Sequence, residues 1–296
     1  LENDIRRILS YSIVNQVGFM IVGIGIGTEL AINGTSAHAF SHIIYKGLLL
    51  MSAGSVLYIT GKRKCTDVGG LYKTMPITAA CGIIGAFAIS AFPFTSGFIS
   101  KSMIVESSYI EGLEIIWYFL LIGSAGVFLH AGIKFPWFVF FHRDKKLEAT
   151  DPPIFMLLPM ISLSFICILI GIFPNLLYIL LPYSVDYIPY TGNHVVSQLH
   201  LLLFSGLAFF MALKYLERTL TITLDIDYLY RRKYTFIMLI FSKIVYYFVS
   251  ILENLKHTKI NKKLYLIENT LLNQSSISVM LSVITIIIIL VFLLNI

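Results

Sequence analysis

Seven apolar runs, each long enough to cross a lipid bilayer as a helix, constrain this chain more than any other feature. A bilayer core about 30 Å thick needs about 20 apolar residues in helical form, and lipid offers no partner to an open backbone. Composition agrees, because a chain that is 57% hydrophobic and 13% charged cannot cover a soluble domain with charge. We therefore predict an all-α, polytopic, multi-pass membrane protein with about seven transmembrane helices. The runs are roughly 11–28, 36–60, 76–110, 113–140, 154–173, 196–216 and 277–295.

The third run, 76–110, is too long for one regular helix and is interrupted by FPFTSGF at 92–98. Pro93 removes a backbone donor, and Gly97, directly after Ser96, loosens the chain. A helix break inside a membrane is tolerated only where protein buries it or where it lines a wet cavity. We expect a broken helix here, inside the bundle and near a pathway.

Basic residues alternate with acidic ones from loop to loop. Lys and Arg cluster at 6–7, 62–64, 143–146 and 231–233, whereas 106–114 and 175–195 contain acidic residues and no Lys or Arg. The net charge of +6 fits an excess of basic residues in cytoplasmic loops. This pattern predicts an inner (cytoplasmic) membrane protein.

Residues 234–272 are compatible with two structures. One is a lateral amphipathic helix on the cytoplasmic face, which keeps the alternation of charge, and the other is an additional transmembrane span.

Three ionisable residues within 36–60 share one helix face. His38, His42 and Lys46 are spaced i, i+4 and i+8, so successive side chains lie about 6 Å apart along the axis. Charges at this depth face the protein interior or water. Because histidine exchanges protons near neutral pH and a desolvated lysine can lose its proton, the three residues predict a proton relay. The alternative is that His38 lies near the membrane boundary and that His42 and Lys46 make structural hydrogen bonds.

Four more polar residues are candidates for the same pathway. Lys101 directly follows the break at 92–98, which can offer it free carbonyl groups. His130 and Lys134 form a second i, i+4 pair, for which snorkelling of Lys134 to the membrane surface is the alternative. Gln16 lies in the first run and can bond another helix or join a relay.

The mid-span segments contain no Asp or Glu, so we expect a carboxylate that modulates these lysines to come from another part of a longer chain or from another subunit. The first residues, LENDIRR, begin without Met, which suggests a fragment.

No phosphate loop, nucleophile elbow, or haem or iron–sulfur ligand pattern is present, and the three cysteines are scattered. We therefore expect no cofactor, no metal, no nucleic acid partner and no enzymatic chemistry in this chain itself.

Three motifs, in order, resemble a known family. NDIRRILSYSIVNQVGF (3–19), HAFSHIIYKGLLLMSAG (38–54) and FPFTSGFISKSMI (92–104) are similar to segments of the proton-conducting antiporter-like subunits shared by complex I and Mrp-type Na⁺/H⁺ antiporters. The resemblance implies a core of fourteen helices with two inverted five-helix repeats. Residues 1–182 would be the second half of that core. Residues 183–296 would be a C-terminal extension with two transmembrane helices and the amphipathic stretch at 234–272.

The resemblance also implies roles and partners. Lys46 would be the lysine on the central hydrophilic axis, His38 and His42 its relay partners, and Lys101 the terminal lysine; Gln16 stands where some relatives have histidine. Partners would be other membrane subunits, lipid, protons and Na⁺. We favour part of a D-type subunit of a Na⁺/H⁺ antiporter. The alternatives are a proton-pumping subunit of NADH-quinone oxidoreductase or of a related membrane hydrogenase, and a scaffold that does not pump.

Overall fold

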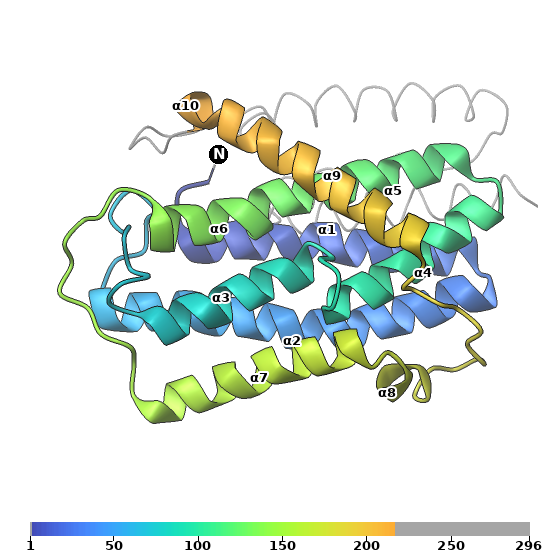
Figure 1. The fold of residues 1–296 in the computed structure, drawn as a ribbon, viewed down its shortest axis with the longest axis horizontal. Helices are drawn as coiled ribbons and strands as arrows, with labels where there is room; N and C mark the ends of the chain where they lie inside the picture. The colour runs from blue at the N-terminus through green and yellow to red at the C-terminus, as the bar shows by residue number, and fades with distance from the viewer. Residues whose placement is uncertain (1, 217–296) are drawn as a thin grey trace, which may run out of the picture. The chain divides into compact units, whose positions relative to one another are not determined.

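The computed structural model describes residues 2–216, and the predictions for 234–272 and 277–295 lie outside the described residues. The described part is a helical bundle, which confirms the all-α membrane architecture (Figure 1). Five of its helical stretches are long and apolar enough to span a membrane, and Pro76–Ile89 is a shorter apolar helix. The five are Ile5–Ile26, Glu29–Thr60, Glu114–Phe141, Ile154–Ile172 and Gly192–Met211.

Helix α2, Glu29–Thr60, is the centre of this bundle. It packs against α1 (Ile5–Ile26), α3 (Pro76–Ile89), α4 (Ser96–Ile110) and α7 (Ile154–Ile172). The other elements are α5 (Glu114–Val127), η1 (Phe128–Ile133), α6 (Lys134–Pro136), η2 (Trp137–Phe141), α8 (Asn175–Tyr178), α9 (Gly192–Met211) and α10 (Leu213–Leu216). Because α2 has protein on several sides, it can carry polar side chains that lipid would not accept.

Local sequence explains how α1 and α2 begin and end. The Asp4 carboxylate accepts hydrogen bonds from the first backbone amides of α1, and the Thr28 hydroxyl accepts one from Ala31 at the start of α2. Both helices end at glycines in the left-handed region, Gly27 at φ 76° and Gly61 at φ 65°. These caps satisfy backbone groups at the ends of both helices.

The predicted helix break is confirmed. Helix α3 ends at Ile89 and α4 begins at Ser96, with Ala91 and Phe94 at positive φ between them. A Cβ atom on Gly97 would collide with the backbone carbonyl of Ala88, so glycine permits the first turn of α4 to lie against the end of α3. The two half-helices therefore stay packed together across the interruption.

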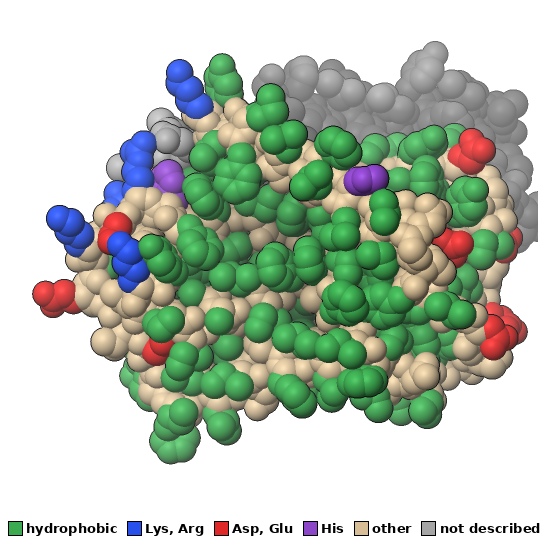
Figure 2. Space-filling view, viewed as in Figure 1, with side chains coloured by type: hydrophobic (Ala, Val, Ile, Leu, Met, Phe, Trp, Pro, Cys, Tyr) green, Lys and Arg blue, Asp and Glu red, His purple; other side chains and the backbone are tan. Residues whose placement is uncertain are grey.

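The outer surface of the described bundle is apolar between two polar ends. Figure 2 shows hydrophobic side chains across the middle of the visible face, with Lys and Arg gathered at one end and Asp and Glu at both ends. Large apolar residues are strongly exposed, for example Phe155 at 87% and Ile115 at 73%. Such a belt suits a bilayer rather than water.

Candidate functional site

The three ionisable residues of α2 are buried along one face of the helix. His38 is fully buried, Lys46 is 4% exposed, and His42 is 8% exposed. The imidazole rings of His38 and His42 stack with their centroids 6.3 Å apart. All three side chains therefore lie inside the protein rather than on its surface.

Helix α1 supplies polar partners to this face. The Lys46 ammonium group donates a hydrogen bond to the hydroxyl of Ser12. The hydroxyl of Tyr45 donates to Gln16 Oε1 at 2.8 Å and lies 3.5 Å from His38 Nε2. Gln16 therefore forms a hydrogen bond to another helix, which is one of the two roles predicted for it. Its partner, Tyr45, also lies next to His38.

Helix α4 continues the polar row beyond His38. The Ser100 hydroxyl lies 3.1 Å from His38 Nδ1 and also 3.1 Å from the carbonyl oxygen of Ser96. The next residue, Lys101, is 2% exposed and donates from Nζ to the carbonyl oxygen of Ile89 at 2.7 Å. That oxygen belongs to the last residue of α3, so the helix break provides the lysine with a carbonyl acceptor.

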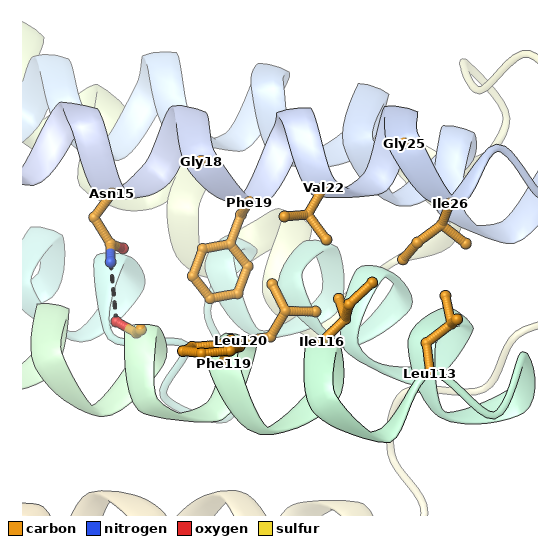
Figure 3. A pocket seen from close by; sticks show the side chains of 11 residues that line it. Asn15, Gly18, Phe19, Val22, Gly25, Ile26, Leu113, Ile116, Phe119 and Leu120 are labelled. Atoms are coloured by element: carbon orange, nitrogen blue, oxygen red, sulfur yellow. Dashed lines mark hydrogen bonds between the residues drawn. The ribbon is translucent and has the colours of Figure 1, made fainter. Parts of the chain in front are cut away.

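Phe19 closes the other side of Lys101. The Lys101 ammonium lies 5.0 Å from the centroid of the Phe19 ring, within the range of a cation–π contact. Phe19 also lines an apolar groove of about 540 Å³ between α1 and α5 (Figure 3). Near this groove Asn15 donates to the carbonyl oxygen of Gly123 at 3.2 Å. Phe19 thus separates the buried lysine from an apolar, lipid-compatible surface.

His42 is the histidine of the row whose hydrogen bonding is incomplete. Its Nε2 atom is buried and has no hydrogen-bond partner among the described residues, and the same holds for the hydroxyl of Ser41. Since buried polar atoms are normally paired, an unpaired nitrogen between Lys46 and His38 has unused capacity to accept or donate a proton.

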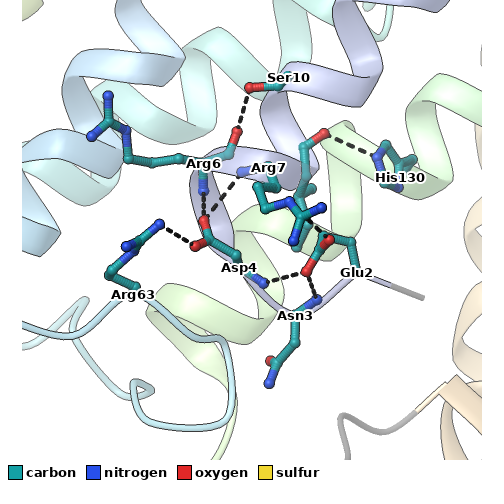
Figure 4. Close-up of polar contacts among 9 residues, drawn as sticks. Glu2, Asn3, Asp4, Arg6, Arg7, Ser10, Arg63 and His130 are labelled. Carbon is teal, nitrogen blue, oxygen red and sulfur yellow. Dashed lines mark hydrogen bonds and ion pairs between the residues drawn. The ribbon is translucent and has the colours of Figure 1, made fainter. Parts of the chain in front are cut away.

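His130 and Lys134 lie outside this row, on the segment formed by η1 and α6. His130 Nε2 lies 3.0 Å from the carbonyl oxygen of Ile8 in α1 (Figure 4). Lys134 is 4% exposed. A side chain that snorkelled to the membrane surface would be accessible, so this buried position is against the snorkelling alternative.

Sequence reasoning missed Ser12, Tyr45 and Ser100. Tyr45 follows His38 by seven residues and His42 by three, so helical spacing alone places it on the same face. Ser12 precedes Gln16 by one helical turn, and Ser100 is adjacent to Lys101. Among the described residues, no three His, Cys, Asp or Glu side chains are grouped as metal ligands would be.

The N-terminal part of the chain is similar to a known family of membrane proteins. Residues 1–130 match the family model described as "NADH:quinone oxidoreductase/Mrp antiporter, TM". Over these residues the chain is similar to that family, and the resemblance predicted from the three motifs is confirmed.

Several curated relatives are similar over part of the chain. The L subunit of the F(420)H(2) dehydrogenase of Methanosarcina mazei is 38% identical over 119 residues, which are 37% of this chain and 18% of that protein. The D-type subunit of the Na(+)/H(+) antiporter of Alkalihalophilus pseudofirmus is 41% identical over 113 residues, 38% of this chain and 23% of that protein. NADH-ubiquinone oxidoreductase chain 5 of Marchantia polymorpha is 33% identical over 184 residues, 58% of this chain and 26% of that protein. The chain thus spans about a quarter or less of these relatives.

Two solved structures share the fold. The Mrp complex from Dietzia sp. DQ12-45-1b matches with a TM-score of 0.54 and 19% identity, over 60% of this chain and 41% of the matched chain. The membrane-bound sulfane sulfur reductase, described as an archaeal respiratory membrane complex, matches with a TM-score of 0.59 and 23% identity, over 99% of this chain and 52% of the matched chain.

Proposed function

We propose that the chain is part of a proton-translocating subunit of a multi-subunit membrane complex, and that protons pass between Lys46 and Lys101 through His42 and His38. In this proposal residues 1–182 are the second half of the proton-conducting core and 183–296 a C-terminal extension. The observation that carries it is the set of buried polar side chains on α1, α2 and α4 that accompanies the two buried lysines.

The partners of the two lysines favour proton exchange over permanent charge. Lys46 bonds a hydroxyl and Lys101 a carbonyl oxygen, and neither forms a salt bridge within the described part of the chain. When one lysine carries a proton, Coulomb repulsion in a weakly screened interior disfavours a proton on the other. The two lysines therefore hold a proton in turn rather than together.

The histidines provide intermediate stations. Neutral imidazole accepts a proton at one ring nitrogen and releases one from the other. His42 Nε2, unpaired and buried, is free to receive a proton from the side of Lys46. Because the rings of His38 and His42 are 6.3 Å apart between centroids, transfer between them requires ring rotation or a bridging water.

For the complex, we favour a Na⁺/H⁺ antiporter in the inner (cytoplasmic) membrane, in which other membrane subunits couple the proton path to Na⁺. The 41% identity to a D-type antiporter subunit supports this choice. The alternative is a proton-pumping module of a respiratory complex, where the chain would be a non-redox part of a translocating enzyme. The 33% identity to NADH-ubiquinone oxidoreductase chain 5, over 58% of this chain, supports that alternative.

The test is transport by the full-length protein in its native complex, reconstituted into liposomes that contain a pH-sensitive dye. We expect Lys46→Ala and Lys101→Ala each to abolish coupled proton movement while the complex still assembles. Lys214→Ala, on an exposed lysine of α10, is the matched control and should transport normally. Wild-type rates in Lys101→Ala would refute the proposal. Proton movement driven by an added Na⁺ gradient identifies the antiporter, and movement that requires an electron donor identifies the respiratory alternative.

A further inference from the structure

The segment 128–141 departs from regular α-helix at the point where it meets the rest of the bundle. Two π-helical stretches, η1 and η2, flank the short helix α6, and Pro136 lies between them. Pro136 has no backbone N–H to give to the carbonyl group of Gly132, so the regular hydrogen-bond pattern cannot continue. Such π-helical turns are rare and often occur at functional sites.

This π-helical segment is held against the helix break by a glycine. A Cβ atom on Gly132 would collide with the side chain of Ser90, which directly follows α3. The close approach places η1 beside both α3 and α1. The widened turn therefore belongs to the packed interior and presents His130 to α1.

The bond of His130 to α1 determines which of its nitrogens can take up a proton. A carbonyl oxygen only accepts hydrogen bonds, so Nε2 must carry the hydrogen that bonds the carbonyl oxygen of Ile8. The Nδ1 atom is then the proton acceptor of the neutral ring. His130 is partly exposed, whereas His38 is fully buried, so His130 is the more accessible base of the two.

His130 and Lys46 contact neighbouring positions of the same helix. His130 bonds the carbonyl of Ile8, and Lys46 bonds the hydroxyl of Ser12, one helical turn further along α1. Ile8 and Ser12, one turn apart on α1, are about 5–6 Å from each other. One water molecule can bridge groups at this separation. The Ser12 hydroxyl donates to Leu9 at 2.8 Å and so offers its lone pairs to the Lys46 side.

On its other side, His130 lies near the charged start of α1. Figure 4 shows it beside the first turns, where Glu2 pairs with Arg7 at 3.3 Å and Asp4 with Arg63 at 2.9 Å. The guanidinium groups are exposed, with 57% of the Arg7 side chain and 64% of the Arg63 side chain accessible. His130 thus lies between an accessible charged end of the bundle and the partner of the buried Lys46.

We infer that His130 is a proton-loading residue that, with Lys134 beside it, exchanges protons between this end of the bundle and Lys46 by way of Ser12. The inference rests on the proposed function. Neutral His130 takes a proton at Nδ1 and becomes imidazolium while Nε2–H stays bonded to Ile8. The proton then passes from Nδ1 to the neutral amine of Lys46, which becomes ammonium, and His130 returns to its neutral form.

The decisive variant is His130→Gln in the full-length, reconstituted complex, because the glutamine amide can still donate to the Ile8 carbonyl but cannot carry a proton. We expect proton transport to fall about tenfold or more, with a changed pH profile and an unchanged melting temperature. His200→Gln, on α9 and outside this cluster, is the control and should keep the wild-type rate and profile. A wild-type rate and profile in His130→Gln would overturn the inference.

Failure of this inference can be told apart from failure of the proposed function. If Lys46→Ala abolishes transport and His130→Gln does not, the relay stands and the loading role of His130 falls. If both transport normally, the proposed function falls as well. If His130→Gln impairs assembly, Lys134→Gln is the deciding variant. We expect it to move the acid limb of the pH profile to higher pH, because a neighbouring ammonium no longer repels the imidazolium, and an unmoved profile would overturn the inference.

Discussion

Replacing Asp151 with alanine tests how the loop after η2 supports the broken helix. Helix α3 begins with Pro76 and has no side-chain cap of its own at Met75. Asp151, which is 73 residues beyond Thr78, supplies the cap: its carboxylate accepts from the backbone N–H of Ile77 at 3.1 Å and of Thr78 at 3.0 Å. It also accepts from the Thr78 hydroxyl at 2.8 Å.

The expected loss has two parts. Removing a helix cap costs about 1 kcal/mol in the free energy of unfolding. The hydroxyl of Thr78 is fully buried, and leaving it without an acceptor adds about 1–3 kcal/mol. The sum is about 2–4 kcal/mol. At about 2–4 °C per kcal/mol for a domain of this size, the melting temperature should fall by roughly 5–15 °C.

The assay is heating of the detergent-solubilised protein followed by size-exclusion chromatography of the fraction that stays folded. Asp151→Asn retains Oδ1 and should lose about half as much stability as Asp151→Ala. Asp144→Ala, at an exposed pair with Lys73 at 3.4 Å, is the control and should melt like the wild type. A wild-type melting temperature for Asp151→Ala would refute the capping argument. Equal losses for the asparagine and alanine variants would show that charge, rather than the hydrogen bonds, is responsible.

Three further predictions concern packing, the polar row and pH. Gly97→Ala should destabilise the fold by about 1–3 kcal/mol, seen as a lower melting temperature, because its methyl group meets the carbonyl of Ala88. Tyr45→Phe should cost about 1–3 kcal/mol in the same assay, because it strands the fully buried Gln16 oxygen. Burial raises the pKa of Tyr187, in the loop before α9, to about 12, so its contribution to stability is complete below pH 10 and is lost between about pH 10 and 12. Tyr187→Phe should remove that alkaline loss in melting curves measured against pH.

The parts of the fold that could be predicted from sequence depend on neighbouring residues. The break at 92–98 follows from Pro93 and Gly97, and the shared face of His38, His42 and Lys46 follows from helical spacing. The helix break and the shared face each depend on residues close together in the chain, so the sequence alone is enough to predict them.

The parts that could not be predicted depend on residues far apart in the chain. The cap of α3 by Asp151 joins positions more than 70 residues apart, and the bond of His130 to Ile8 joins positions 122 residues apart. Local pattern carries no information on such pairs. The π-helical turns around Pro136 were missed for another reason, since a proline near the end of an apolar run is equally compatible with a kink or a helix end.

In the proposed relay, the kind of partner that each lysine has distinguishes a structural proton from an exchangeable one. At the surface, Lys73 pairs with Asp144, an arrangement in which loss of the lysine proton would leave a carboxylate unpaired. Lys46 and Lys101 are buried against a hydroxyl and a carbonyl oxygen, which are neutral. When either lysine gives up its proton, no buried anion is stranded, and the amine can still donate a hydrogen bond to the same oxygen. Neutral partners therefore let the buried lysines change charge without disrupting the packing around them, which is the property that a proton relay requires.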